Sequence, residues 1–417
     1  MPLAGIVDTA LLGKEKTSAS LSGVALAGAI FSFLYWGFAF IRMSTTGLTS
    51  RSLGEKRASE TVLILLRSLG LGLFIGLLML GASSLIELVG FELLQGEAEV
   101  EAQGILYFRA RLWGAPAVLA LMAVNGWLLG RGLSREVLIL SMVQNSSIIG
   151  LDYLFIRTWG WGAEGAGYAT ALSDIVALCF GLVLVLVSWK ELPKLCFKGL
   201  WNRNGLKTLL RLNGQIFVRS FFLILTLASF TNISGWMGGD VVAANAILLQ
   251  LLLFSSYFLD GFAYSLETLV GYASGKGDWG QVRTQLRIAL LASTLTTLFF
   301  ACLFRLFGRD ILDWLSHFPT VNALAWQLSP YLLMVMFVSS FAYIYDGLGV
   351  GLTWGAPLRN SVMVGSIVGF FPLATLSVLQ GSPSVLWLAF LAFAGMRSSV
   401  LAFTAERWLA RISSMDN

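Results

Sequence analysis

The sequence predicts an all-α membrane protein that crosses the bilayer many times. Of its 417 residues, 57% are hydrophobic and only 12% are charged, and the mean hydropathy is +0.78. Apolar segments long enough to cross about 30 Å of hydrocarbon as helices follow one another along the chain. This composition excludes a water-soluble globular protein.

Eleven of these segments have the length of a membrane span. They cover residues 21–43, 62–86, 105–129, 136–156, 162–189, 216–236, 241–272, 288–307, 328–352, 358–379 and 385–403. A shorter stretch at 2–12, which contains Asp8, reaches only about 17 Å as a helix. We expect it to be the second half of a first helix whose beginning is absent from the chain, which makes twelve helices in all.

An internal repeat indicates how these helices are organised. A shift of 221 residues lays 53–54 over 274–275, and it lays 125–130, with their glycines, over 346–351. One offset that fits two distant places indicates a duplicated chain, although coincidence among glycines remains the alternative. We therefore expect two six-helix bundles related by a pseudo-two-fold axis along the membrane normal.

The expected boundaries of these bundles follow from the charges. A basic linker at 190–212 separates an N-terminal bundle, 1–189, from a C-terminal bundle, 213–417. Loops on one side contain Arg51, Lys56, Arg57, Arg131, Arg135, Lys190, Lys194, Lys198, Arg203, Lys207, Arg211, Lys276, Arg283, Arg287, Arg359, Arg407 and Arg411. Loops on the other side contain only Lys14, Lys16, Arg157, Arg305 and Arg309.

This asymmetry predicts that the basic side and both termini are cytoplasmic. As a separate expectation, we place the chain in a bacterial plasma (inner) membrane. The formal net charge of +5 then reflects loops beside an anionic leaflet. We infer no nucleic-acid partner from it.

Catalytic and metal chemistry find little support in the sequence. His317 is the only histidine, and Cys179, Cys196 and Cys302 form no CxxC pair. These residues offer no multi-histidine metal site and no redox pair. We expect neither enzymatic activity nor a cofactor.

Ionisable side chains inside the apolar segments are the informative ones, because charge in a bilayer is costly and usually functional. They are Asp8, Arg67, Arg109, Arg111, Asp152, Asp174, Arg219, Asp260, Glu267, Asp346 and Arg397. Asp260 and Glu267 leave one helix face about 10 Å apart along the axis, so that face must meet a cavity or a partner helix. For Arg67, Arg397 and Asp174 we favour ion pairing that holds helices together. For Asp8 and Asp152 we favour a functional role.

Eight segments resemble those of a known family. They are PLAGIVDTALLG, FAFIRMSTTGLTSRSLG, YFRARLWGAPAVLALMAVNGWLLG, LDYLFI, GAEGAGYATALSD, AANAILLQ, YFLDGFAYSLETLVGYASGKG and DGLGVGLTWGAPLRNSVM. Together they resemble the MATE family of multidrug and toxin extrusion transporters, and its DinF-type branch in particular. The resemblance runs over essentially the whole chain.

The resemblance implies a secondary antiporter that exports organic cations or amphipathic toxins in exchange for protons or sodium. The family's ion-coupling positions fall on Asp8, Tyr107, Asn125, Asn145, Asp152 and Thr170. Ile148 stands where the family has a further asparagine, which favours protons over sodium. We expect a monomer in the lipid bilayer. A lipid-linked precursor flippase and a non-transporting degenerate relative remain alternatives.

In the second half, we expect a substrate cavity with two acids, aromatic side chains that stack on a flat cation, and one amide. The residues are Asp260, Glu267, Tyr257, Tyr264 and Asn245.

Overall fold

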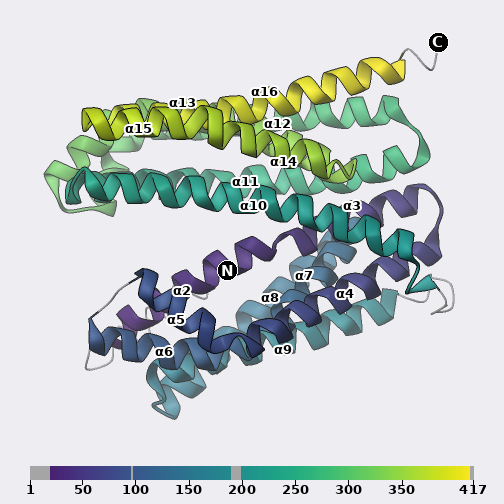
Figure 1. Cartoon of the computed structure of the whole chain (residues 1–417), viewed down its shortest axis with the longest axis horizontal. Coiled ribbons are helices and arrows are strands. Elements are labelled where there is room, and N and C mark those ends of the chain that lie inside the picture. The colour runs from purple at the N-terminus through teal and green to yellow at the C-terminus, as the bar shows by residue number, and fades with distance from the viewer. Residues whose placement is uncertain (1–18, 95–96, 189–198, 414–417) are drawn as a thin grey trace. The chain divides into compact units, whose positions relative to one another are not determined.

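The computed structural model of the chain describes residues 19–94, 97–188 and 199–413, and within these ranges the regular structure is entirely helical (Figure 1). The all-α prediction is thereby confirmed. The predicted half-helix at 2–12, with Asp8, lies outside the described residues. The chain divides into two compact units, which we describe separately. Unit 1 comprises residues 1–49 and 57–206, and unit 2 comprises residues 50–56 and 207–417.

Unit 1 contains eight α-helices and one π-helical turn within its described residues; the C-terminal end of α3 belongs to unit 2. The elements are α2 (Ala19–Phe38), α3 (Phe40–Gly54), α4 (Ala58–Gly81), α5 (Ser83–Leu94), α6 (Ala98–Leu112), α7 (Ala115–Gly130), α8 (Ser134–Asp152), η1 (Tyr153–Thr158) and α9 (Gly162–Ser188). Helix α9 packs against α6, α7 and α8, and α6 packs against α2.

Most of the helices of unit 2 are longer than the described helices of unit 1. Its elements are α10 (Arg203–Trp236), α11 (Gly239–Lys276), α12 (Trp279–Leu315), α13 (Pro319–Gly351), α14 (Gly355–Val364), the π-helical turn η4 (Gly365–Phe370), α15 (Phe371–Gln380) and α16 (Pro383–Ser413). Helix α13 packs against α11, α12 and α16, and these helices run alongside one another (Figure 1).

The predicted spans are confirmed within the described residues. Ten continuous helical stretches are long and apolar enough to cross a membrane, and the bent pair α6–α7 makes an eleventh. Their outer surfaces are apolar: Leu77 is 60% exposed, Trp236 72% and Leu379 79%. An apolar surface of this extent suits contact with lipid.

One predicted span is broken. The sequence predicts a single helix over 105–129, but the chain bends by 54° between α6 and α7. Pro116 lies in the first turn of α7, where its missing N–H costs nothing. Gly114 lies against Ala171 of α9, so that a Cβ on this glycine would approach the Ala171 Cα to 2.8 Å. The bend therefore separates the polar residues of α6 from those of α7.

The glycines of the predicted repeat make equivalent contacts in the two units. In unit 1, Cβ atoms on Gly126 and Gly130 would lie 2.5 Å from the Arg42 carbonyl oxygen and 2.7 Å from that of Thr46. In unit 2, Cβ atoms on Gly347 and Gly351 would lie 2.6 Å from the Ala263 carbonyl oxygen and 2.7 Å from that of Glu267. Every residue of the first set is offset by 221 from its counterpart in the second. Chance alignment of glycines does not produce matching contact partners, so the structure supports a duplicated helix pair.

Large aromatic side chains fill the core of each unit. Trp127 of α7 is fully buried, and its Nε1 donates a hydrogen bond of 3.0 Å to the Thr61 carbonyl oxygen of α4. In unit 2, Trp387 packs edge-on against Phe230, with ring centroids 5.3 Å apart. Both tryptophans satisfy their N–H group, as a buried indole requires.

Candidate functional site

A cluster of polar and aromatic side chains around Arg111 lies inside unit 1; we call it the Arg111 cluster. The Arg111 Nη1 donates a hydrogen bond of 2.8 Å to the Tyr107 hydroxyl. The guanidinium carbon lies 4.6 Å from the ring centre of Phe31, 5.6 Å from that of Tyr107 and 6.0 Å from that of Tyr35. Aromatic faces stabilise a cation in a membrane interior through cation–π attraction. Helices α2 and α6 thus hold the positive charge in place.

The acidic member of this cluster is Asp174 of α9, which is 4% exposed. Its Oδ1 accepts a hydrogen bond of 2.7 Å from the Gln144 Nε2 of α8. Arg111 is near enough to act on the Asp174 charge, and Tyr35 lies within electrostatic range of both. A buried carboxylate is tolerated only when a hydrogen bond or an opposite charge compensates it, and Asp174 has both.

The other predicted coupling residues of unit 1 lie on α7, α8 and α9. Asp152 is fully buried at the C-terminal end of α8, where the π-helical turn η1 begins. The Asn145 Nδ2 and the Thr170 hydroxyl donate to carbonyl oxygens of their own helices, Ser141 at 2.8 Å and Ala166 at 3.0 Å.

Asn125 of α7 differs from Asn145 and Thr170. Its amide oxygen is buried and accepts no hydrogen bond from the described residues. The structure therefore brings Tyr107 into the Arg111 cluster, while Asn145 and Thr170 bond within their own helices. Asp8 lies outside the described residues, so its distance to these groups is not defined.

Unit 2 contains a buried ion triad on three helices. Asp346 of α13 accepts hydrogen bonds at one carboxylate oxygen from Arg219 of α10 and from Arg397 of α16. Their side chains are 8 to 9% exposed. The sequence favoured ion pairs that hold helices together for Arg397 and Arg67. This is confirmed for Arg397, whereas the acid that pairs with Arg67 lies on the same helix, α4. Arg67 binds Glu60 at 2.7 Å and donates to two backbone carbonyl oxygens in the segment 199–200.

The predicted cavity residues of unit 2 all lie on α11. Glu267 is 2% exposed and Asp260 is half-buried, and Asp260 acts electrostatically on Tyr343 of α13. Tyr257 is 56% exposed, and Tyr264 is half-buried.

Asn245, the fifth predicted cavity residue, lies in the helix packing. Its Nδ2 donates to the Ser234 hydroxyl of α10, and its Oδ1 accepts from the Trp387 Nε1 of α16, both at 2.8 Å. In this structure, therefore, the Asn245 side chain ties α10, α11 and α16 together.

Sequence reasoning missed three members of the Arg111 cluster: Phe31, Tyr35 and Gln144. Two of them are aromatic residues of an apolar helix, and the glutamine is uncharged, so a search for charge inside spans does not detect them. Gln144 had one usable signal, since it directly precedes Asn145 in the middle of a predicted span. No group of three or more histidine, cysteine, aspartate or glutamate side chains in the described part of the chain is arranged to hold a metal ion.

Comparison with known proteins identifies the family. The sequence model of the MatE family matches residues 1–154 and 216–375. DNA damage-inducible protein F of Escherichia coli K12 is 33% identical over 415 residues, which cover 98% of this chain and 89% of that protein. A probable multidrug resistance protein NorM of Acinetobacter baylyi is 23% identical over 423 residues, covering 99% and 85%.

Solved structures agree on the fold. The crystal structure of MATE in the bent conformation matches with a TM-score of 0.89 at 19% identity, covering 99% of this chain and 92% of that one. An outward-facing multidrug resistance MATE transporter of the MOP superfamily matches with a TM-score of 0.87, also at 19% identity, with the same coverage of 99% and 92%. These likenesses confirm the predicted fold class. The chain belongs to the MATE family of multidrug and toxin efflux transporters and is thus a multi-pass membrane transporter, not an enzyme.

Proposed function

We propose that this protein is a secondary antiporter that exports organic cations or amphipathic toxins in exchange for protons, with ion coupling in unit 1. The observation that carries the proposal is the fully buried carboxyl group of Asp152, inside a membrane span and next to a π-helical turn. A charged carboxylate in a membrane is costly, and protonation removes that cost. π-helical turns occur frequently at functional sites.

The proposed cycle uses the chain's own polar groups. Protons from outside neutralise the coupling carboxyl groups, one proton each for Asp8 and Asp152. Their neutralisation changes the interactions of these groups with Tyr107, Asn125, Asn145 and Thr170. The Arg111 cluster adds Asp174, an acid whose charge is held by Gln144 and Arg111. Because Asp174 lies in the same unit as the coupling acids, a coupling acid can change its protonation while Asp174 keeps its charge. The substrate leaves when the unit rearranges.

Transport in proteoliposomes tests the proposal. Efflux of a fluorescent cationic dye is followed under an imposed pH gradient or an imposed sodium gradient, for the wild-type chain, Asp152→Asn, Asp8→Asn and a control, Asp310→Asn. Asp310 is an exposed acid of α12, so its variant should transport normally. We expect the pH gradient alone to drive efflux and Asp152→Asn to abolish it. Normal efflux by Asp152→Asn would refute coupling through this residue, and efflux driven only by sodium would refute proton exchange.

The flippase alternative requires arginines that face a pyrophosphate. Arg219 and Arg397 both bind Asp346, and Arg111 binds Tyr107 among aromatic rings. We therefore favour the antiporter.

A further inference from the structure

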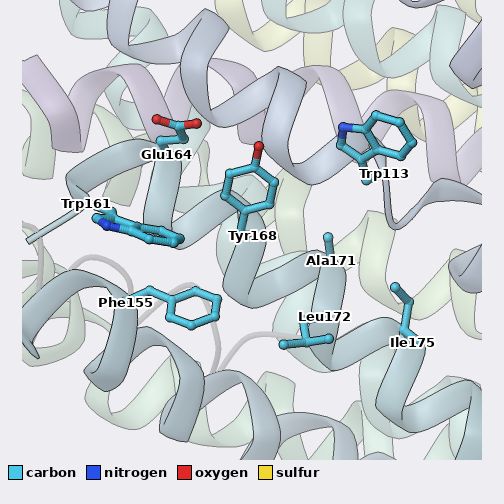
Figure 2. A pocket seen from close by; sticks show the side chains of 8 residues that line it. All are labelled: Trp113, Phe155, Trp161, Glu164, Tyr168, Ala171, Leu172 and Ile175. Carbon is cyan, nitrogen blue, oxygen red and sulfur yellow. The ribbon is translucent and has the colours of Figure 1, made fainter. Parts of the chain in front are cut away.

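A pocket of about 710 Å³ opens on unit 1 beside the first half of α9, apart from the Arg111 cluster (Figure 2). Trp113, from the α6–α7 bend, and Trp161, from the turn before α9, contribute to its walls. Helix α9 supplies Glu164, Tyr168, Leu172 and Ile175. We call it the Glu164 pocket. Its lining is aromatic and aliphatic except for one acid.

The polar end of the pocket lies at the first turn of α9. Glu164 is exposed, and it makes no hydrogen bond or ion pair with any residue that the structure describes. Figure 2 shows its carboxylate and the Tyr168 hydroxyl pointing the same way, at one end of the pocket. Trp161 and Tyr168 stand edge to face, with centroids 6.3 Å apart. Aromatic rings beside a carboxylate favour an organic ammonium ion and repel an anion.

The other end of the pocket is apolar. Glu164, Tyr168, Leu172 and Ile175 repeat at helical spacing on one face, and from Glu164 to Ile175 the helix rises about 17 Å. Beyond Ile175 the exposed surface of α9 stays apolar, with Val183 51% exposed and Leu186 66%. The lining of the pocket thus changes from polar at Glu164 to apolar at Ile175. This gradient matches an amphiphile that has a charged head at one end and an apolar tail at the other.

We propose that the Glu164 pocket binds an ammonium-bearing amphiphile, with its head between Glu164 and the aromatic rings and its tail along α9. Two sources share this chemistry: a membrane lipid with an ammonium head group and an amphipathic cationic drug. By the orientation expected from the basic loops, the head would lie at the outer face of the membrane. Aromatic belts at membrane surfaces explain tryptophans at this depth, but they explain neither a cavity nor the acid at its end. The proposal concerns binding alone and holds whether or not the ion-coupling scheme does.

Native mass spectrometry of the full chain, released from an uncharged detergent, measures this binding without transport. The protein is titrated with dodecyltrimethylammonium, with phosphatidylethanolamine and with phosphatidylglycerol of the same acyl chains. The variants are Glu164→Gln and a matched control, Glu99→Gln, which also removes an exposed acid from the first turn of a helix. Size-exclusion chromatography establishes that each variant is folded.

We expect Glu164→Gln to weaken binding of the ammonium amphiphiles by about three- to tenfold, with phosphatidylglycerol unaffected and Glu99→Gln equal to wild type. Loss of phosphatidylethanolamine binding in Glu164→Gln would identify a lipid site. Loss of dodecyltrimethylammonium binding alone would identify a drug site. Equal binding of all three amphiphiles to wild type and Glu164→Gln would overturn the proposal and leave an apolar groove without charge selectivity.

Discussion

Replacing Asp346 by asparagine removes the acid that Arg219 and Arg397 share in unit 2. Because all three side chains are at most 9% exposed, the weak energies of surface ion pairs do not apply. Removal of one partner from a buried pair costs about 3–5 kcal/mol, since the remaining charge stays buried without compensation. Here the loss affects two cations at once, so we place Asp346→Asn at the upper end of this range.

The number of buried arginines that lose the Asp346 carboxylate predicts the order of stability of three variants: Arg397→Met, Asp346→Asn and the double variant. Arg397→Met leaves Asp346 paired with Arg219, so it removes one charged hydrogen bond worth about 1.5–3 kcal/mol. Adding Arg397→Met to Asp346→Asn leaves one arginine, instead of two, that has lost its bond to the residue 346 carboxylate. The double variant should therefore be no less stable than Asp346→Asn alone, and the two single effects should not add.

Thermal unfolding in detergent, followed by tryptophan fluorescence, measures these differences. For a cooperative unit of about 200 residues, each kcal/mol lowers the Tm by about 2–4 °C, so Asp346→Asn, at about 5 kcal/mol, should lower it by roughly 10–20 °C. The exposed Asp310→Asn serves as the control for loss of a carboxylate. An Asp346→Asn protein that melts with wild type, or an Arg397→Met effect as large as that of Asp346→Asn, would refute the shared-acid reasoning.

Three further substitutions test helix packing in unit 2 by the same thermal melts. Gly347→Ala places a methyl group 2.6 Å from the Ala263 carbonyl oxygen, so it should cost about 1–3 kcal/mol; Gly395→Ala, which meets open space, should be neutral or stabilising by up to about 1 kcal/mol. Equal melting of the two variants would contradict the close crossing of α11 and α13. Trp387→Phe leaves the buried Asn245 oxygen without its donor and should cost about 1–3 kcal/mol; an unchanged Tm would show that this hydrogen bond contributes little.

The membrane spans and the internal repeat were predictable because the sequence pattern alone reveals them, without knowledge of how the helices pack. A run of apolar residues has the same meaning in any context, and glycines that allow helices to cross recur at one offset. The bend between α6 and α7 also had a local signal, since Gly114 and Pro116 are residues that commonly end or start a helix. A hydropathy pattern that continues through both helices concealed it.

The partners of the buried charges were not predictable in the same way. Arg397 lies 51 residues from Asp346, and Arg219 lies 127 residues from it, so their meeting depends on how three helices pack. Gln144 and Asp174, on different helices, present the same difficulty. Glu164 lies at the start of a span, and acids are common near helix N-termini because the helix dipole stabilises them. The sequence therefore gives no reason to select Glu164, and the pocket around it is the feature that does.

The two units use the same glycine crossings but place different chemistry beside them. At the repeated offset, unit 1 has Asn125, an uncharged amide whose oxygen accepts no hydrogen bond from the described residues, where unit 2 has Asp346, bound by two arginines. One acid between two fixed cations leaves a site with a net positive charge, which repels a further cation. Asp174 of unit 1 has one arginine, Arg111, acting on its charge, so a change of protonation there alters the local charge balance more. This asymmetry adds support to the proposal that ion coupling lies in unit 1, which rests on the buried Asp152 carboxyl group and which the Asp152→Asn transport assay tests.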